Sequence, residues 1–325
     1  MNTILRNAAG ALALATAFGA STALADDIRL GVVAVNYNSP SIQLQADSGA
    51  AHAKELGWKV ELFDGQGDQV ATNNAAMAFI DRGFDAILNV ASANTQMTGV
   101  IDYAAEKDVP FVSTFSGLVP GIVADIGSNN TADGVIAATE LAGRIQGEGH
   151  VAALNWNVLP ALIERQRGFE AVMAGFPGVE VTKVEIKVPG QVDDAYAQAT
   201  NLLLANDDLK AFWVGWDELA APVARAIEQA GKEGEVFVVS QDGIPEVLEL
   251  VRQGGPVELT VAYNVKRMGV VAVDVIKAAL GGEKPASALL TLKPCLVTEA
   301  TAPAKGEELD FTTCGLFSGE TVATH

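Results

Sequence analysis

Short runs of apolar, often β-branched residues alternate with longer amphipathic stretches along most of the chain. Runs of this kind, bounded by turn residues, are typical of buried strands, and the stretches between them are typical of helices. Strands are predicted at residues 28–35, 59–63, 86–90, 111–113, 122–126, 151–155, 179–188, 212–215, 236–240 and 259–262. The regular alternation predicts an α/β fold of parallel βαβ units rather than a β-sandwich or a helical bundle.

Glycines mark the ends of several predicted helices, because a glycine readily adopts the left-handed conformation that closes a helix. Helices that stop at a glycine are predicted at residues 70–82, 218–230 and 264–280. An earlier helix begins near Pro40, which suits a first helical turn, and ends at Gly57. Leu44, Ala51 and Leu56 fall roughly on one face of it.

The number of strands indicates two sheets, since about ten strands in one sheet would be unusual. The alternation restarts near Ser128, after the extra short strand at 122–126. About 300 residues without a leader also exceed a typical single domain. We therefore predict two Rossmann-like lobes. The strand at 259–262 and the helix after it can return to the first lobe, which makes the connection between the lobes multi-stranded.

The first 25 residues have the pattern of a secretory signal peptide. Arg6 precedes an apolar, Ala-rich run at 8–20, and a small-x-small cleavage signal ends at Ala25. The run is shorter than the roughly 20 residues that span a bilayer. Neither Cys295 nor Cys314 lies near the cleavage point, so no lipid-carrying cysteine follows the signal. We expect an exported protein that is free in the periplasm, without direct membrane insertion.

The charge balance disfavours polyanionic partners. The chain has 21 Lys and Arg against 40 Asp and Glu, a formal charge of −19, which becomes −20 without the segment that holds Arg6. Nucleic acids and anionic membrane surfaces would repel such a protein.

Cys295 and Cys314 enclose 18 residues. In an oxidising compartment we expect them to form a disulfide, which would stabilise the fold by roughly 3 kcal/mol. Two unpaired thiols are the alternative.

The carboxyl ends of the predicted strands hold the candidate ligand-binding residues, because ligands of open parallel sheets bind there. Amides, hydroxyls and aromatic rings dominate these ends, and no Arg or Lys occurs in them. The candidates are Tyr37, Asn38, Asn89, Phe115, Trp156, Trp216, Gln241 and Asp242. An anionic ligand is disfavoured, since a buried charge needs an opposite charge beside it. A small neutral ligand is expected, although the aspartates leave a cationic one open.

Several candidates have a structural alternative. Trp156 and Trp216 can stack on a sugar ring or a heterocycle, or they can pack between the lobes. Asp64 suits a turn and Asp217 suits a helix N-cap, as well as a ligand contact. Trp213 lies inside its strand and is predicted to belong to the core.

The sequence contains no recognisable arrangement of catalytic residues. The three histidines are His52, His150 and His325, which suit neither a Ser-His-Asp arrangement nor a histidine metal cluster. No phosphate-binding loop follows the first strand. We predict a protein that is not an enzyme and needs no cofactor; a secreted α/β enzyme is a minor alternative.

From about residue 27 to 297 the chain resembles the type I periplasmic sugar-binding proteins, the ribose-binding-like family. The resemblance lies in the order and spacing of "IRLGVVAVNYNSP", "ERQRGFEAVMAGFPGVEV", "WDELAAPVARAIEQAG" and "VSQDGIPEVLELVRQG". It implies a three-segment hinge with crossovers near 128–130, 263–264 and 286–289. The implied division is 26–128 plus 264–286 for the N-terminal lobe, 129–263 plus 287–299 for the C-terminal lobe, and 300–325 for a C-terminal tail.

The resemblance also implies ligand contacts for Asn38, Asn89 and Asp242, the last as an acceptor for a sugar hydroxyl. Other positions depart from the family pattern. Phe115-Ser116 replace the usual Asp-Arg, Ile163 replaces an arginine, Trp216 replaces an asparagine, Gln241 replaces an aromatic residue, and Tyr263 stands where a glutamine often contacts ligand. Tyr263 is expected to form part of the ligand wall or to pack in the hinge, and Arg165 is expected to be structural.

Together these features imply the substrate-binding component of an ABC transporter. It would capture a sugar, a deoxy sugar or a polyol by hinge closure and deliver it, as a monomer, to a membrane permease. Two alternatives remain open: an accessory for a chemoreceptor or sensor kinase, and a binder of a nucleoside-like heterocycle.

Overall fold

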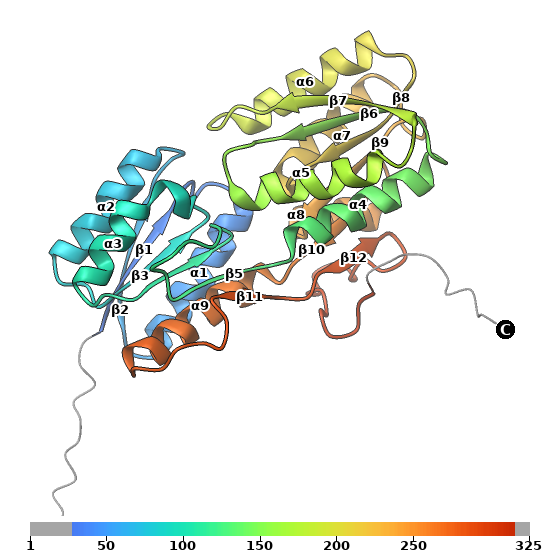
Figure 1. The fold of residues 1–325 in the computed structure, drawn as a ribbon. Coiled ribbons are helices and arrows are strands. Elements are labelled where there is room, and N and C mark those ends of the chain that lie inside the picture. Colours follow the sequence, from blue (N-terminus) through green and yellow to red (C-terminus); the bar gives the residue numbers. More distant parts are fainter. Residues whose placement is uncertain (1–27, 316–325) are drawn as a thin grey trace, which may run out of the picture.

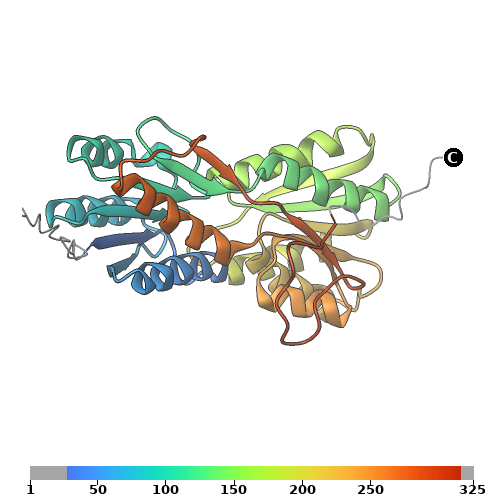
Figure 2. The ribbon, with the colours of Figure 1, turned by 90° about the horizontal axis from the view of Figure 1, so that it is seen from below.

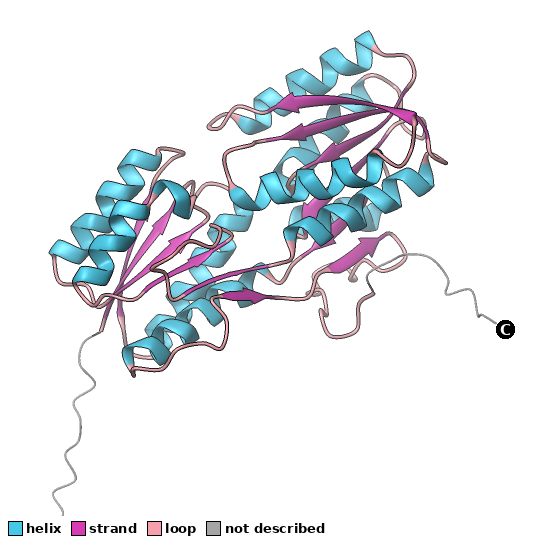
Figure 3. Cartoon of the chain, viewed as in Figure 1, coloured by secondary structure: helices cyan, strands magenta, loops and turns pink. Residues whose placement is uncertain are grey.

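The computed structural model describes residues 28–315 and shows two lobes, each built on a six-stranded sheet with helices on both faces (Figures 1 and 3). All strand pairs are parallel except that of the last strand, which is antiparallel to its neighbour. The predicted α/β class and the two parallel-sheet lobes are confirmed. The predicted signal peptide at 1–25 and the last part of the predicted tail lie outside the described residues.

The first lobe has the strand order β11-β5-β4-β3-β1-β2. Its strands are β1 (Arg29–Ala34), β2 (Lys59–Asp64), β3 (Ala86–Val90), β4 (Phe111–Thr114), β5 (Ala124–Gly127) and β11 (Leu289–Thr291). Its helices are α1 (Pro40–Glu55), α2 (Gln69–Asp81), the short η1 (Asn94–Gln96), α3 (Thr98–Glu106) and α9 (Val265–Leu280). Helix α1 packs against α9, and α2 packs against α3.

The second lobe has the strand order β12-β10-β9-β8-β6-β7. Its strands are β6 (Glu148–Asn155), β7 (Gly178–Glu185), β8 (Leu209–Val214), β9 (Phe237–Asp242), β10 (Val257–Ala262) and β12 (Cys295–Thr298). Its helices are α4 (Asn130–Arg144), α5 (Pro160–Met173), α6 (Gln191–Ala205), the short η2 (Asp217–Leu219), α7 (Ala220–Gln229) and α8 (Pro245–Gln253). Helix α4 packs against α5, and α6 packs against α7.

The hydrophobic pattern of each strand follows from its place in the sheet. Every residue of the central strand β3 is buried, because helices cover both faces of the sheet. The outer strands β2 and β7 mix exposed and half-buried residues instead. Each of the ten predicted strands overlaps one of β1–β10. The two remaining strands, β11 and β12, are short and gave no clear pattern.

The chain crosses between the lobes three times. The crossovers lie between β5 and α4, between β10 and α9, and between β11 and β12. Figure 2 shows the last of them as the red segment that runs from one lobe to the other. The predicted position of this crossover, 286–289, is wrong by a few residues. Because β11 pairs with β5 and satisfies the backbone groups of that strand, the chain leaves the first sheet only after Thr291.

The buried face of α1 consists of small and polar residues. Ala51 is exposed, and Leu44 and Leu56 are only half-buried. The buried residues of α1 are Ser41, Gln45, Ala46, Gly49, Ala50 and Ala53. Small residues are needed because the backbones of α1 and α9 approach closely: a Cβ atom added to Gly269 would lie 2.1 Å from the carbonyl oxygen of Gln45. This packing brings the polar Gln45 to the buried face.

The C-terminal segment is fastened to the second lobe. A disulfide joins Cys295 on β12 to Cys314, with 5.5 Å between the Cα atoms, as predicted. Leu309 and Phe311 pack against the core of this lobe. Trp213 is fully buried and stacks on Phe169 with 4.8 Å between the ring centroids, so its predicted place in the core is confirmed.

No helix between residues 28 and 315 has both the length and the apolar character needed to cross a membrane.

Candidate functional site

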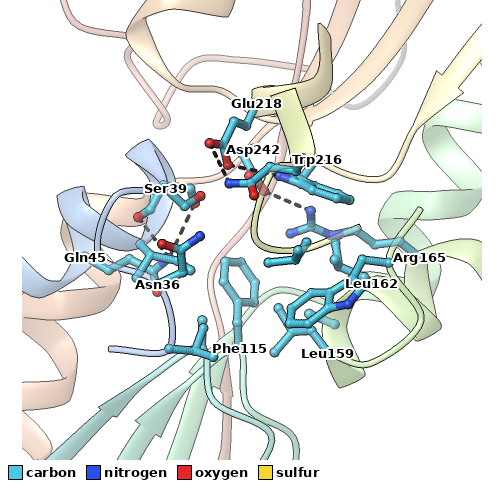
Figure 4. Close-up of a pocket in the computed structure, with 18 residues that line it drawn as sticks. Asn36, Ser39, Gln45, Phe115, Leu159, Leu162, Arg165, Trp216, Glu218 and Asp242 are labelled. Carbon is cyan, nitrogen blue, oxygen red and sulfur yellow. Dashed lines mark hydrogen bonds and ion pairs between the residues drawn. The ribbon is translucent and has the colours of Figure 1, made fainter. Parts of the chain in front are cut away.

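A cavity lies between the two lobes, where the carboxyl ends of both sets of parallel strands face each other (Figure 4). It contains about 560 Å³ of space not filled by atoms, part of which opens to solvent. Small-molecule sites in proteins occur preferentially at such interfaces between domains. The cavity is therefore the candidate ligand site.

The first lobe lines the cavity with both small polar residues and apolar ones. Asn36 and Ser39 follow β1, Gln45 lies on α1, and Phe115 follows β4. The side chain of Gln45 is 1% exposed, and its Nε2 donates to the backbone carbonyl oxygen of Ser41 at 3.1 Å. Its Oε1 is buried without a hydrogen-bond partner.

Three cavity residues have a left-handed backbone. Ala91, Phe115 and Asp242 have φ angles of 57°, 53° and 139°. Residues with a side chain avoid this region, and each such residue costs on the order of 1–3 kcal/mol. Such strain collects at functional sites, where it directs a side chain toward a ligand. Here it occurs on both sides of the cavity, after β3 and β4 in one lobe and at the end of β9 in the other.

The second lobe contributes larger side chains. Trp156 follows β6 and Trp216 follows β8. The indole Nε1 of Trp216 donates to Glu218 at 3.3 Å, and the Nε2 of Gln191 donates to the other oxygen of the same carboxylate at 3.0 Å. Gln191 begins α6, is 7% exposed, and has a buried Oε1 without a hydrogen-bond partner. Leu159 and Leu162 complete an apolar wall (Figure 4).

A buried ion pair joins two cavity residues of the second lobe. An Nη of Arg165 lies 2.8 Å from Asp242 Oδ1, and their side chains are 2% and 5% exposed. The guanidinium also lies over the rings of Tyr263 and Phe115, at 4.7 and 5.2 Å from the ring centroids. Burial raises the pKa of Asp242 to about 7, although the positive charge of Arg165 opposes this shift. Arg165 thus has its counter-charge within the protein.

Contacts around the cavity join the two lobes directly. A Cβ atom added to Gly117 of the first lobe would lie 3.0 Å from Pro160 of the second. One added to Gly67 would lie 3.3 Å from Pro189. The lobes therefore approach each other closely at two places, as expected when two lobes close around a ligand.

Of the nine predicted ligand-binding residues, four line this cavity: Phe115, Trp156, Trp216 and Asp242. Tyr263 lies beneath Arg165, and its hydroxyl donates to Gln241 at 3.2 Å. Gln241 is fully buried and does not line the cavity. Tyr263 therefore packs against the cavity residue Arg165, and Gln241 in turn accepts a hydrogen bond from Tyr263.

The remaining predicted residues take part in local networks. The fully buried Asn89 donates to Asn94 at 2.9 Å, under the first-lobe wall. Tyr37 donates from its hydroxyl to Asp47 at 2.5 Å, and Asn38 donates to Asp64 at 3.4 Å. None of these three lines the cavity.

Two acidic residues have structural roles. Asp64 accepts the backbone N–H of Tyr37 at 2.9 Å, in agreement with a role in a turn. The N-cap role considered for Asp217 is wrong. Its buried carboxylate accepts the hydroxyls of Ser240 and Thr260 and the backbone N–H groups of Gly243 and Ile244, so it braces the loop after β9.

Gln45, Arg165 and Gln191 are among the cavity residues that the sequence did not predict. All three belong to helices, whereas the predicted site residues follow or end strands. For Arg165 the "R-x-x-GF" motif was visible but was assigned a structural role. For Gln45 the only signal was a polar residue among small residues on one helical face.

Comparisons with known proteins agree with this architecture. A model of the periplasmic binding protein domain matches residues 30–284. The ribose import binding protein of Bacillus subtilis is 25% identical over 266 residues, which cover 79% of this chain and 83% of that protein. The D-allose-binding periplasmic protein of Escherichia coli is 32% identical over 151 residues, covering 46% of this chain and 48% of that protein.

Solved structures share the fold. An ABC transporter solute-binding protein from Agrobacterium vitis, determined with bound allitol, has a TM-score of 0.80 at 23% identity and covers 85% of this chain and 96% of that chain. Since the family model spans well over half of the sequence, this chain belongs to the periplasmic binding protein family.

Proposed function

We propose that this protein is the solute-binding component of an ABC importer that captures a small neutral ligand between its lobes. The ligand class is a sugar, a deoxy sugar or a polyol, which the protein binds without catalysis and delivers to a membrane permease. The periplasm is the proposed location, and a monomer the proposed state.

The observation that carries this proposal is the charge balance of the cavity. Arg165, the one cation among its lining residues in the described chain, is neutralised by Asp242 at 2.8 Å. The other lining carboxylate, Glu218, accepts hydrogen bonds from Gln191 and Trp216. An anionic ligand would have to compete with that carboxylate for the guanidinium, and an unpaired buried charge costs several kcal/mol. The cavity instead offers aromatic faces and amides, which suit a neutral ring or chain with hydroxyl groups.

The two-sided lining supports hinge closure as the mechanism. One set of contacts comes from the first lobe, through Gln45 and Phe115, and another from the second, through Trp156, Trp216 and Gln191. Only the closed form offers both sets, so a ligand that needs both selects it. Hinge closure of this kind is general among periplasmic binding proteins.

The relatives support the ligand class. By their names they import ribose and bind D-allose, and the Agrobacterium vitis protein holds allitol. A nucleoside-like heterocycle is the second candidate. The three aromatic rings around the cavity, those of Phe115, Trp156 and Trp216, favour it, because planar heterocycles stack on such rings.

A thermal-shift screen tests the proposal. The panel contains D-ribose, D-allose, allitol, 2-deoxy-D-ribose, adenosine, and, as charged controls, phosphate and a dipeptide. A ligand at a hundredfold excess over its Kd stabilises the folded state by about 2.7 kcal/mol, which raises the melting temperature measurably. We expect at least one sugar or polyol to do so. A shift with phosphate or the dipeptide alone would refute the proposed ligand class.

A further inference from the structure

Two glutamines that line the cavity each have a buried side-chain oxygen without a hydrogen-bond partner. Among the residues that line the cavity in the described chain, the unpartnered buried side-chain atoms are Oε1 of Gln45 and Oε1 of Gln191. Their side chains are 1% and 7% exposed, so solvent does not readily replace the missing partner. Most buried polar groups in proteins are hydrogen-bonded, and each that is not costs about 1–3 kcal/mol.

The partners of the two amide nitrogens show that these atoms are acceptors. Gln45 Nε2 lies 3.1 Å from the carbonyl oxygen of Ser41, and Gln191 Nε2 lies 3.0 Å from a carboxylate oxygen of Glu218. A carbonyl and a carboxylate only accept hydrogen bonds, so the nitrogen of each amide must face them. In both glutamines the free end is therefore the oxygen.

The two acceptors belong to opposite lobes. Gln45 lies on α1 of the first lobe and Gln191 at the start of α6 of the second. A ligand that satisfies both oxygens needs two donor groups and holds the two lobes together. A ligand that lacks one donor leaves a buried oxygen unpaired, and sites built around such bonds reject analogues without the donor strongly.

We propose that Gln45 and Gln191 determine the specificity of the site, each by accepting a hydrogen bond from a different hydroxyl of the ligand. The inference rests on the proposed function and narrows its ligand class to solutes with at least two free hydroxyls, which excludes ligands that offer only apolar or acceptor groups. Glu218 is a positioning residue, since it orients the Gln191 amide and, through Nε1, the Trp216 ring.

Isothermal calorimetry on the full-length exported protein tests this. The probe is whichever of D-ribose, D-allose and allitol binds most tightly, together with its monodeoxy analogues. Gln45→Met and Gln191→Met remove the acceptors at similar volume. Gln43→Met, exposed on α1, and Gln198→Met, on α6 outside the cavity, are matched controls that remove the same kind of amide.

We expect each cavity variant to weaken binding of the probe by about 10- to 100-fold, the size of one lost buried hydrogen bond, and each control to change it less than twofold. One monodeoxy analogue should bind wild type and Gln45→Met equally, and a different analogue should bind wild type and Gln191→Met equally. Glu218→Ala should affect the same hydroxyl as Gln191→Met. In the double variant Gln191→Met/Glu218→Ala, removal of that hydroxyl from the ligand should cost no more affinity than it does in Gln191→Met.

The outcomes separate this inference from the proposed function. If none of the three probes binds wild type, the ligand class fails and the inference fails with it. A probe could bind while the cavity variants bind it as well as their controls do, or while removal of a ligand hydroxyl costs the cavity variants as much affinity as it costs wild type. Either result refutes the inference alone. Binding of the monodeoxy analogues to wild type is a second test, which needs no variant to fold. Removal of at least two different hydroxyls should each weaken binding tenfold or more. If fewer than two do so, the inference is also refuted.

Discussion

The two lobes share one sheet order, but they present different walls to the cavity. The first lobe contributes small polar residues and one ring, Phe115, whereas the second contributes two tryptophans and the Arg165–Asp242 pair. Buried charge is concentrated in the second lobe as well, where Asp133 and Asp217 are fully buried near this pair.

This difference suggests that the two lobes contribute at different stages of ligand binding. The second lobe offers most of the aromatic surface, so we expect it to hold the ligand first in the open form. The first lobe then adds Gln45 and the Phe115 ring on closure. On this view the second lobe should carry more of the binding energy and the pH-sensitive part of the stability.

The largest effect is expected for Arg165→Met. Loss of one partner of a buried ion pair typically costs about 3–5 kcal/mol, because the other charge remains unpaired. Because burial raises the pKa of Asp242 to about 7, the carboxyl takes up a proton in acid, and the loss should be smaller at pH 5 than at pH 8. Urea unfolding at the two pH values measures this.

The exposed Arg167→Met on the same helix is the control, with an expected change below about 0.5 kcal/mol. Arg165→Met combined with Asp242→Asn should recover part of the loss at pH 8. An equal loss for Arg165→Met and Arg167→Met would contradict a dominant role for the buried pair.

Loss of the disulfide should destabilise the second lobe next most strongly. Cys295 and Cys314 close a loop within this lobe, and a loop of this length is worth about 3 kcal/mol in the chain-entropy account. Replacing both cysteines by alanine should lower the free energy of unfolding by about that amount. A reducing agent should lower it in wild type but leave the double variant unchanged; sensitivity of the double variant to reduction would rule out this explanation.

The pH dependence of stability should depend in part on Asp133. Burial raises its pKa to about 6, against the opposing effects of Ser128 and Arg165. A carboxyl whose pKa is higher in the folded than in the unfolded state favours folding below the unfolded pKa of about 4. That contribution is lost as the pH rises through about 6.

The contribution of Asp133 should therefore fall by up to about 3 kcal/mol between pH 4 and pH 7. Asp133→Asn should remove it, so the stability of the variant relative to wild type should increase over this range. Urea midpoints from pH 4 to pH 8 give the measurement. A constant difference between the two proteins would show that Asp133 does not titrate in this window.

The smallest of these effects concerns the aromatic rings of the two walls. Trp216→Ala should weaken binding of the best sugar or polyol by about 2 kcal/mol, roughly 30-fold in Kd, because it removes a large ring from a buried contact. Phe115→Leu should weaken it by about 1 kcal/mol or less, since an apolar side chain remains in the first lobe. Calorimetry on both variants would overturn the proposed difference between the lobes if Phe115→Leu had the larger effect.

The fold was predictable because local patterns were consistent with it. Each of the ten predicted runs overlaps a strand, and the central strands are apolar throughout because helices cover both faces of each sheet. The third crossover was misplaced because β11 is three residues long and owes its place to pairing with β5. A short strand that forms because it pairs with a distant strand need not show a strand pattern in its own sequence.

The site was predictable only in part, for a related reason. Phe115, Trp156, Trp216 and Asp242 follow strands, and the carboxyl ends of parallel strands meet at one edge. Asn89 and Gln241 also occur near strand ends, yet they lie below the surface of the cavity. Strand-end position identifies the region of the site, but the depth of each side chain depends on how the following loop turns.

The sequence by itself determined the alternation of strands and helices, the two lobes, the cysteine pair and the polar, aromatic character of the strand ends, because each depends on local composition and period. Only the tertiary structure decided which side chains share the cavity. Close packing of α1 on α9 through small residues places Gln45 on a buried face, and the meeting of the lobes sets it opposite Gln191 and Arg165. Contacts between residues more than a hundred positions apart determine such placements, and no local pattern encodes them.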